Sequence, residues 1–183
     1  MKFKKIDITG FKSFSEKTTI LIEDGLTGIV GPNGCGKSNI VEALRWCMGE
    51  NSAKSMRGSG MEDVIFSGTS NRSSKNISEV TLILDNQNKE GSAQYNEFDE
   101  ISVKRKIEKD KGSKYFINDK EVRARDVQTF FADLSTGAHS PCMISQGRIG
   151  QLVIAKPIER KSILEEAAGI SGIHARRQEA ETR

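Results

Sequence analysis

The sequence has few cysteines, no long apolar stretch and almost no net charge. Its three cysteines, Cys35, Cys47 and Cys142, are an odd number without C-x-x-C spacing, which argues against a disulfide framework and against a zinc site. No apolar run approaches the roughly 20 residues of a membrane span. The first residues, MKFKKIDITGF, lack the apolar core of a signal peptide. We therefore expect a cytoplasmic protein in a reducing environment, with no membrane partner.

The charges of the chain nearly cancel. It has 28 Lys and Arg residues against 25 Asp and Glu residues, so its formal net charge is only +3. Net charge therefore neither demands nor excludes a nucleic-acid partner, and any contact with DNA must come from local basic patches. With 183 residues, of which 36% are hydrophobic and 29% charged, the chain is long enough to bury one core. We expect one domain or a large part of one.

Short apolar runs near the N-terminus predict β-strands. Residues 6–8 alternate apolar and polar side chains, residues 18–22 form a second run, and residues 26–30 form a third. A turn at residues 24–25 would join the last two runs into a hairpin. From Lys37 the pattern changes to the single stripe of an amphipathic helix, formed by Ile40, Val41, Leu44, Cys47 and Met48. A strand, a glycine-rich loop and a helix are therefore predicted in that order.

The middle of the chain has the pattern of an antiparallel meander. Val80, Leu82 and Leu84 alternate with polar residues, and turn-prone residues separate the apolar runs at 101–103 and 115–117. Helical spacing then returns in Val127, Phe130, Phe131 and Leu134.

Beyond residue 134 the pattern is less regular. The run at residues 142–144, which follows Pro141, suggests a short strand. Pro157 suits the first turn of a strongly charged helix that is expected to follow.

One glycine-rich motif carries specific chemistry. It satisfies G-x-x-x-x-G-K-[ST] and consists of Gly31, Pro32, Asn33, Gly34, Cys35, Gly36, Lys37 and Ser38. The glycines let backbone N–H groups surround phosphate oxygens, Lys37 adds a charge near the β and γ phosphates, and Ser38 offers a hydroxyl to Mg²⁺. A chance match in a chain of this length is expected on the order of one time in a hundred. We therefore predict nucleotide binding.

The residues favour ATP over GTP. A GTPase needs a base-reading Asn-Lys-x-Asp, and the nearest match, Asn88-Lys89-Glu90-Gly91, lacks the aspartate. A small-molecule kinase would carry an arginine-rich lid over a parallel sheet, whereas an antiparallel meander follows the first helix here. Such a meander is a feature of ABC-type ATPases.

The whole chain resembles bacterial proteins of the SMC (structural maintenance of chromosomes) family. The segments that carry the resemblance occur in the family's order and are GFKSF at 10–14, GPNGCGKSNI at 31–40, RGSGMEDVIFSG at 57–68, ISQGRI at 144–149 and EEAAGI at 165–170. The stretch GISGIHARR is similar to the alphaproteobacterial branch. The sequence departs from the family at Cys35, where Ser is more usual, at Met56, where Leu is common, and in LSTGAHSPCM.

This resemblance implies an α/β fold of the P-loop NTPase type. Residues 1–168 would form the N-terminal half of an ABC-type ATPase head, with a mixed sheet and an antiparallel β meander, and residues 169–183 would begin a coiled-coil arm. In the family, two heads enclose two ATP molecules and hydrolysis serves chromosome condensation and segregation. The implied partners are double-stranded DNA, a C-terminal half-head, a second copy joined through hinge and heads, and kleisin-type subunits. The implied location is the bacterial nucleoid.

The resemblance also implies roles for single residues. Gln146 matches the Q-loop glutamine, which completes the Mg²⁺ shell and senses the γ phosphate, and Arg57 matches the R-loop arginine, which links DNA contact to hydrolysis. Together with the phosphate-loop lysine, these are the expected catalytic residues. Lys12 and Ser13 match a segment near the adenine end of the nucleotide, and Asn39 belongs to the phosphate-loop segment.

Two segments imitate catalytic motifs. Residues 80–85 imitate a Walker B strand, but Asn86 stands where a catalytic glutamate should, and the resemblance places a meander strand there. Residues 134–137 imitate an ABC signature, but nothing downstream could serve as its Walker B. Because these 183 residues contain neither motif, we expect the chain alone to bind ATP weakly and to hydrolyse it near background.

Two other functions can each be distinguished from that of an SMC head. A RecN- or Rad50-type repair ATPase shares the head but differs in the R-loop and after the Q-loop, and here RGSGMEDVIFSG and EEAAGI favour SMC. A non-catalytic chain that only assembles with a partner half-head would show no ATP turnover of its own.

Overall fold

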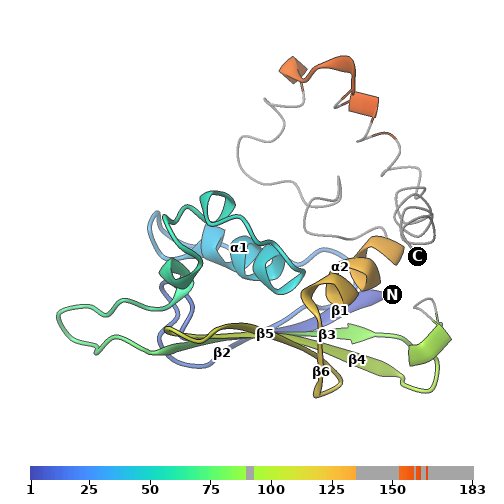
Figure 1. Cartoon of the computed structure of the whole chain (residues 1–183), viewed down its shortest axis with the longest axis horizontal. Coiled ribbons are helices and arrows are strands. Elements are labelled where there is room, and N and C mark those ends of the chain that lie inside the picture. The colour runs from blue at the N-terminus through green and yellow to red at the C-terminus, as the bar shows by residue number, and fades with distance from the viewer. Residues whose placement is uncertain (90–92, 135–152, 159, 162–163, 165–183) are drawn as a thin grey trace.

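A six-stranded antiparallel sheet forms the base of the molecule (Figure 1). The computed structural model describes residues 1–89, 93–134, 153–158, 160–161 and 164. The strands are β1 (Lys2–Thr9), β2 (Thr18–Leu21), β3 (Ile77–Asp85), β4 (Glu100–Glu108), β5 (Gly112–Ile117) and β6 (Lys120–Val122), in the spatial order β2-β1-β3-β4-β5-β6. Every neighbouring pair is antiparallel. The expectation of a mixed sheet is therefore corrected for the part of the chain that the structure describes.

Both long helices lie on the same face of this sheet (Figure 1). Helix α1 (Lys37–Cys47) packs on β3 and β4, whereas α2 (Ala124–Asp133) packs on β5. The short 3-10 turns are η1 (Lys54–Met56), η2 (Met61–Val64) and η3 (Ala93–Tyr95). Helical backbone also occurs at Pro157, as expected. Among the described residues, no helix combines the length and the apolarity that crossing a membrane requires.

The predicted meander is confirmed by the run from β3 to β6. Strands β3 and β4 pair residue for residue, from Ile77 opposite Glu108 to Asp85 opposite Glu100. Because side chains alternate between the two faces of a strand, every second residue points toward the helices. The residues buried between sheet and helices include Ile6, Ile8, Val80, Leu82, Leu84, Ile101, Val103, Ala43, Trp46, Cys47, Val127 and Phe131.

The buried face of α1 differs from the predicted stripe. The helix forms as predicted from Lys37, but its most buried apolar residues are Ile40, Ala43, Trp46 and Cys47. Val41 and Leu44 are only half-buried. The Trp46 ring lies 5.4 Å from that of Phe11, and burying this large aromatic surface decides which side of the helix faces the sheet.

The strand expected at residues 26–30 does not form. Leu26 is 99% exposed and Val30 is 93% exposed. A strand needs a neighbour for its backbone N–H and C=O groups, and none of the described strands pairs with this segment. The glycine-rich loop therefore follows an extended, exposed segment rather than a strand or the second arm of a hairpin.

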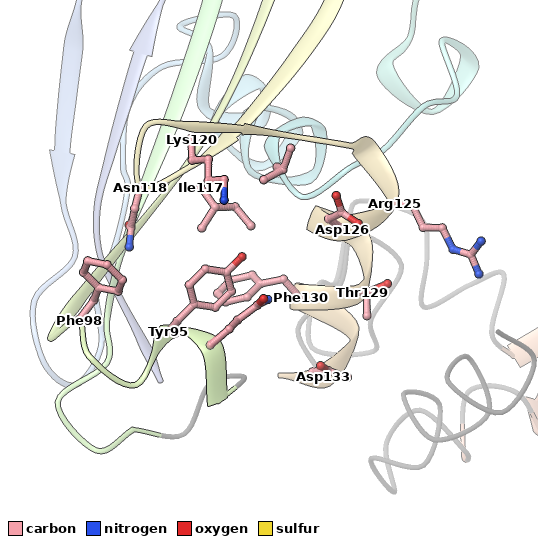
Figure 2. Close-up of a pocket in the computed structure, with 12 residues that line it drawn as sticks. Tyr95, Phe98, Ile117, Asn118, Lys120, Arg125, Asp126, Thr129, Phe130 and Asp133 are labelled. Carbon is pink, nitrogen blue, oxygen red and sulfur yellow. The ribbon is translucent and has the colours of Figure 1, made fainter. Parts of the chain in front are cut away.

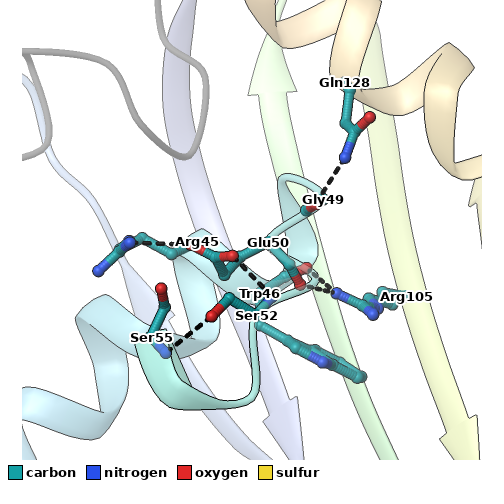
Figure 3. Close-up of polar contacts among 8 residues, drawn as sticks. All are labelled: Arg45, Trp46, Gly49, Glu50, Ser52, Ser55, Arg105 and Gln128. Carbon is teal, nitrogen blue, oxygen red and sulfur yellow. Dashed lines mark hydrogen bonds and ion pairs between the residues drawn. The ribbon is translucent and has the colours of Figure 1, made fainter. Parts of the chain in front are cut away.

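A buried arginine of the meander anchors the C-terminal end of α1 (Figure 3). The Nη1 of Arg105 donates hydrogen bonds to the carbonyl oxygens of Trp46, at 2.8 Å, and of Glu50, at 2.6 Å. The last carbonyls of a helix have no partner within the helix, so Arg105 supplies donors that α1 lacks. From the other side, Gln128 of α2 donates to the carbonyl of Gly49 at 2.8 Å. The far end of α1 is thereby fixed to both the sheet and α2.

The guanidinium of Arg105 also lies between two aromatic rings. Its centre is 4.5 Å from the Trp46 ring and 4.7 Å from the Tyr115 ring, which are cation–π distances. Burial lowers the pKa of Arg105 and raises the pKa of Tyr115 to about 12. Burial likewise raises the pKa of the Cys47 thiol to about 12, so this cysteine is an unreactive part of the core.

Candidate nucleotide-binding site

The glycine-rich loop ends at the N-terminus of α1 in a conformation that requires glycine. Gly34 has φ +82° and Gly36 has φ +95°, both in the left-handed region. Gly36 is also the N-cap residue of α1, and no side chain caps the helix there. A Cβ at this position would lie 2.5 Å from the Ser13 hydroxyl oxygen. The first N–H groups of α1 are thus available to an anion, and the loop can approach its neighbours closely.

Lys37 folds back over this loop. Its Nζ donates hydrogen bonds to the carbonyl oxygens of Gly31 and Pro32, each at 2.6 Å, and lies 3.8 Å from the sulfur of Cys35. The whole segment from residue 31 to residue 35 is exposed. A positive charge is therefore concentrated above an accessible loop at the positive end of a helix dipole.

A second turn, at residues 10–14, approaches the same helix end. Gly10 has φ +62°, and a Cβ on it would lie 2.2 Å from the carbonyl oxygen of Ile77, so no other residue fits at this crossing. The turn is joined to residues 64–66 by hydrogen bonds from the Lys12 N–H to the Val64 carbonyl, at 2.7 Å, and from the Phe66 N–H to the Gly10 carbonyl, at 2.8 Å. Ser13 and Lys12 of this turn contact Asn39 and Glu42 of α1.

Asn39 connects this turn to the segment that contains Arg57. Its Nδ2 donates to the hydroxyl of Ser13 at 2.9 Å, and its Oδ1 accepts a hydrogen bond from Nη2 of Arg57 at 3.0 Å. Asn39 immediately follows Ser38, whose side chain is exposed. Residues from three separate segments of the sequence therefore meet beside the phosphate loop.

Glu42 completes the cluster and was not predicted from the sequence. Its carboxylate pairs with Lys12 and with the Nε of Arg57, the latter at 2.5 Å, and only 10% of its side chain is exposed. Lys12 also donates to the carbonyl of Met56. One signal could have revealed Glu42: it is a single acid on a helix whose first residues already belong to a phosphate loop.

The structure places most of the predicted site residues in one region. Lys12, Ser13 and Arg57 all contact the first two turns of α1 through Asn39 or Glu42. Lys12 is engaged with a carboxylate and a carbonyl, so its proximity to an adenine ring stays a prediction. Gln146 lies outside the described residues, as do the predicted strand at 142–144, residues 135–137 of the signature-like segment and the coiled-coil start at 169–183.

The imitation of a Walker B strand is a meander strand, as predicted. Residues 80–85 belong to β3, between β1 and β4. The phosphate-loop side of the molecule lies at the opposite end of β3, where Ile77 crosses Gly10. At about 3.3 Å per residue, Asp85 lies about 25 Å from Ile77 along the strand. Asp85 therefore lies at the end of β3 away from the turn that contacts the first turn of α1.

A pocket of about 690 Å³ lies elsewhere, between α2, the β5–β6 hairpin and η3 (Figure 2). Its walls include Tyr95, Ile117 and Phe130, with Phe98 and Lys120 near its rim. None of its lining residues belongs to the loop or turns around α1's N-terminus. We therefore do not assign nucleotide binding to this pocket.

A glycine-rich loop that leads into a helix, with Lys and Ser at the first helical positions, defines a P-loop nucleotide-binding protein. The chain belongs to the RecF/RecN/SMC N-terminal domain family, whose model matches residues 2–145. Two similar proteins are the Chromosome partition protein Smc of Cereibacter sphaeroides, at 56% identity, and that of Rhodopseudomonas palustris, at 54% identity. Each match covers all of this chain but only 16% of the relative, so the chain spans a small part of these proteins.

Solved SMC head domains have the same fold. An Smc head bound to the C-winged helix domain of ScpA matches with a TM-score of 0.86 and 29% identity, over 93% of this chain and 52% of that chain. The head domain of Pyrococcus yayanosii Smc, with a coiled coil and joint, matches with a TM-score of 0.82 and 30% identity, over 99% of this chain and 35% of that chain. The predicted ABC-type head fold is confirmed by these matches.

Proposed function

We propose that this chain is the ATP-binding half-head of an SMC ATPase that acts in chromosome condensation and segregation. The observation that carries the proposal is the phosphate loop: Gly36 caps α1 in the left-handed conformation, and Lys37 lies over the loop. Matches to named Smc proteins over the whole chain support SMC over a RecN- or Rad50-type repair ATPase.

The residues present fit Mg-ATP. Backbone N–H groups around Gly34 and Gly36 would bind the phosphates, Lys37 would exchange its loop carbonyls for phosphate oxygens, and the exposed Ser38 hydroxyl would bind Mg²⁺. Bound Mg²⁺ would offset the negative charge that develops during phosphoryl transfer. Gln146 is the further residue that we propose at the metal.

We propose that a C-terminal half-head completes this chain. Exposed apolar residues flank the phosphate loop on its N-terminal side: Leu26 and Val30 are almost fully accessible, and Ile29 is 47% exposed. Such a run suits a strand that pairs with another part of the head. The completed heads would then dimerise on ATP, and a second copy would also join through the hinge.

The remaining partners follow from the relatives. One similar structure is an Smc head bound to a domain of ScpA, and we propose a kleisin-type subunit of this kind for the present protein. Another similar structure belongs to SMC ATPases with ATP-driven dimerisation and DNA-stimulated activation. We propose that double-stranded DNA contacts Lys and Arg side chains without base specificity, and that the protein associates with the bacterial nucleoid.

ATP turnover tests this proposal. The chain alone should hydrolyse ATP near background, because it contains neither a Walker B glutamate nor a signature. Addition of the C-terminal half-head should give slow, magnesium-dependent turnover that double-stranded DNA stimulates, and Lys37→Ala should abolish it. A complete head without any turnover would contradict the proposal and favour a purely structural assembly role. Robust turnover by the chain alone would show that a catalytic residue had been missed.

A further inference from the structure

Three segments of the chain meet at one buried carboxylate beside the phosphate loop. Glu42 lies on α1 with its carboxylate between Lys12 from the turn at residues 10–14 and Arg57 from the end of η1. Only 10% of the Glu42 side chain and 14% of the Lys12 side chain are exposed, whereas 59% of the Arg57 side chain is exposed. The carboxylate is thus an interior anchor for a cation that faces outward.

Two acceptors on one face of α1 fix the plane of the Arg57 guanidinium. Nε of Arg57 contacts Glu42 Oε1 at 2.5 Å, and Nη2 donates to Asn39 Oδ1 at 3.0 Å. Asn39 and Glu42 are three residues apart, so their side chains are neighbours on the helix surface. Within the described residues Nη1 has no hydrogen-bond acceptor. Two contacts with α1 therefore orient the guanidinium.

Glu42 also fixes the backbone at Arg57 through Lys12. The Lys12 ammonium contacts both Glu42 and the carbonyl oxygen of Met56, the residue before Arg57. Arg57 itself has φ +56°, a left-handed conformation that non-glycine residues seldom adopt without support. One carboxylate thus supports the side chain directly and the strained backbone indirectly.

A carboxylate at this place has an electrostatic cost. It lies within the second turn of α1, near the helix end where we propose that phosphates bind, and a negative charge there opposes theirs. A buried carboxylate is also costly unless it is paired. The two cations that pair with Glu42, Lys12 and Arg57, offset both costs. An apolar residue at position 42 would pack in the same place without binding either cation.

We propose that Glu42 is a positioning residue that orients Arg57 at the first turn of α1, and that Arg57 so oriented couples DNA contact to ATP hydrolysis, as the SMC resemblance implies. This inference rests on the proposed function, because it assigns a supporting residue to the same nucleotide site. Glu42 acts through Arg57 and need not touch nucleotide itself.

The test uses the head completed by its C-terminal half-head and measures stimulation of ATP turnover by double-stranded DNA. Glu42→Gln and Arg57→Ala should each lower the stimulation roughly threefold to tenfold, the effect expected for loss of one charge-assisted contact at a partly exposed site. The double variant should lose no more than Arg57→Ala alone, and Glu42→Asp should restore part of the stimulation. Glu16→Gln is the matched control, since it neutralises a paired but exposed carboxylate.

Full stimulation in Glu42→Gln, or losses that multiply in the double variant, would overturn the inference. A second measurement does not depend on turnover. The Arg57 Nε–H resonance, assigned by its absence in Arg57→Ala, should be protected from exchange in the wild type and less protected in Glu42→Asp. Equal protection would contradict the positioning role even if Glu42→Gln failed to fold. A wild type that lacks ATP binding but shows the protected Nε–H would refute the proposed function and leave the positioning contact intact.

Discussion

The Nη1 atom of Arg105 lies 2.8 Å from the carbonyl oxygen of Trp46. This bond joins the centre of the meander to the C-terminal end of the helix whose N-terminal end carries the phosphate loop. Because Glu42 and Asn39 attach the other end of α1 to two surface turns, the helix is fixed at both ends. The meander therefore serves as the support of the phosphate loop rather than as a separate lobe.

Loss of the Arg105 side chain should destabilise the whole chain. Arg105→Met keeps an apolar stem between the rings but removes the guanidinium hydrogen bonds to the carbonyls of Trp46 and Glu50. We expect the free energy of unfolding to fall by roughly 2 to 4 kcal/mol, measured by urea denaturation. Lys104→Met, on the opposite and more exposed face of β4, should cost less than about 1 kcal/mol. Equal losses would contradict the anchoring role of Arg105.

The two described cysteines should differ in reactivity. Cys35 is exposed in the phosphate loop, whereas Cys47 is buried with a pKa of about 12. A thiol-alkylating reagent at neutral pH should label Cys35 and spare Cys47, because the thiolate is the reactive form. Mg-ATP should slow labelling of Cys35, which peptide mapping by mass spectrometry can follow. The control is Cys35→Ser, which removes the thiol that ATP should protect. Equal labelling rates of Cys35 with and without Mg-ATP would argue against nucleotide binding at this loop.

Asp63 should stabilise the segment after Arg57 in a pH-dependent way. The N–H groups of Gly60 and Ser59 donate to its carboxylate at 3.0 and 2.6 Å and lower its pKa. A carboxylate with a lowered pKa contributes stability above its ordinary pKa of about 3.9, and this contribution is lost as the pH falls through the lowered folded value. The melting temperature of the wild type should therefore exceed that of Asp63→Asn at pH 6, and the gap should close once the pH has fallen below the lowered folded pKa of Asp63. A gap that is independent of pH would show that the ionised form is not what stabilises the turn.

The exposed run before the phosphate loop should matter for assembly and not for the stability of the chain. Leu26→Ser with Val30→Ser removes side chains that are almost fully exposed, so unfolding of the chain should change little. Association with the C-terminal half-head should weaken, as measured by titration of the half-head. Phe98→Ser, at the pocket in Figure 2, is the control that should leave association unchanged. Unaltered association of the double variant would contradict the proposed pairing.

The elements that could be predicted are those that a local sequence pattern specifies. Alternation predicted β3, and short apolar runs separated by turn-prone residues predicted β4 and β5. The glycine-rich motif predicted the loop, and the apolar stripe from Lys37 predicted α1. Residues 26–30 have a strand-like composition, but a strand exists only with a partner, and sequence pattern does not show whether one is present.

The pairing of Glu42 was not predicted, because its partners are distant in the sequence. Glu42 contacts Lys12, 30 residues earlier, and Arg57, which belongs to a motif that suggested no acidic partner. The buried stripe of α1 was displaced for a similar reason, since Trp46 packs on Phe11 from a separate turn. Long-range contacts thus decide which helix face is buried and which charge is paired.

Calorimetric titration of Mg-ATP tests the central claim most directly, with the chain and its C-terminal half-head together. Among the described residues, the hydrogen bonds of Lys37 Nζ go to loop carbonyls and to the Cys35 sulfur, and a bound phosphate could replace them. Lys37→Ala should weaken Mg-ATP binding at least roughly tenfold, the loss of one charge-assisted contact, and Ser38→Ala should weaken it chiefly when Mg²⁺ is present. Lys120→Ala, at the separate pocket in Figure 2, should bind like the wild type. Unchanged affinity in both Lys37→Ala and Ser38→Ala would contradict the assignment of this loop as the nucleotide site.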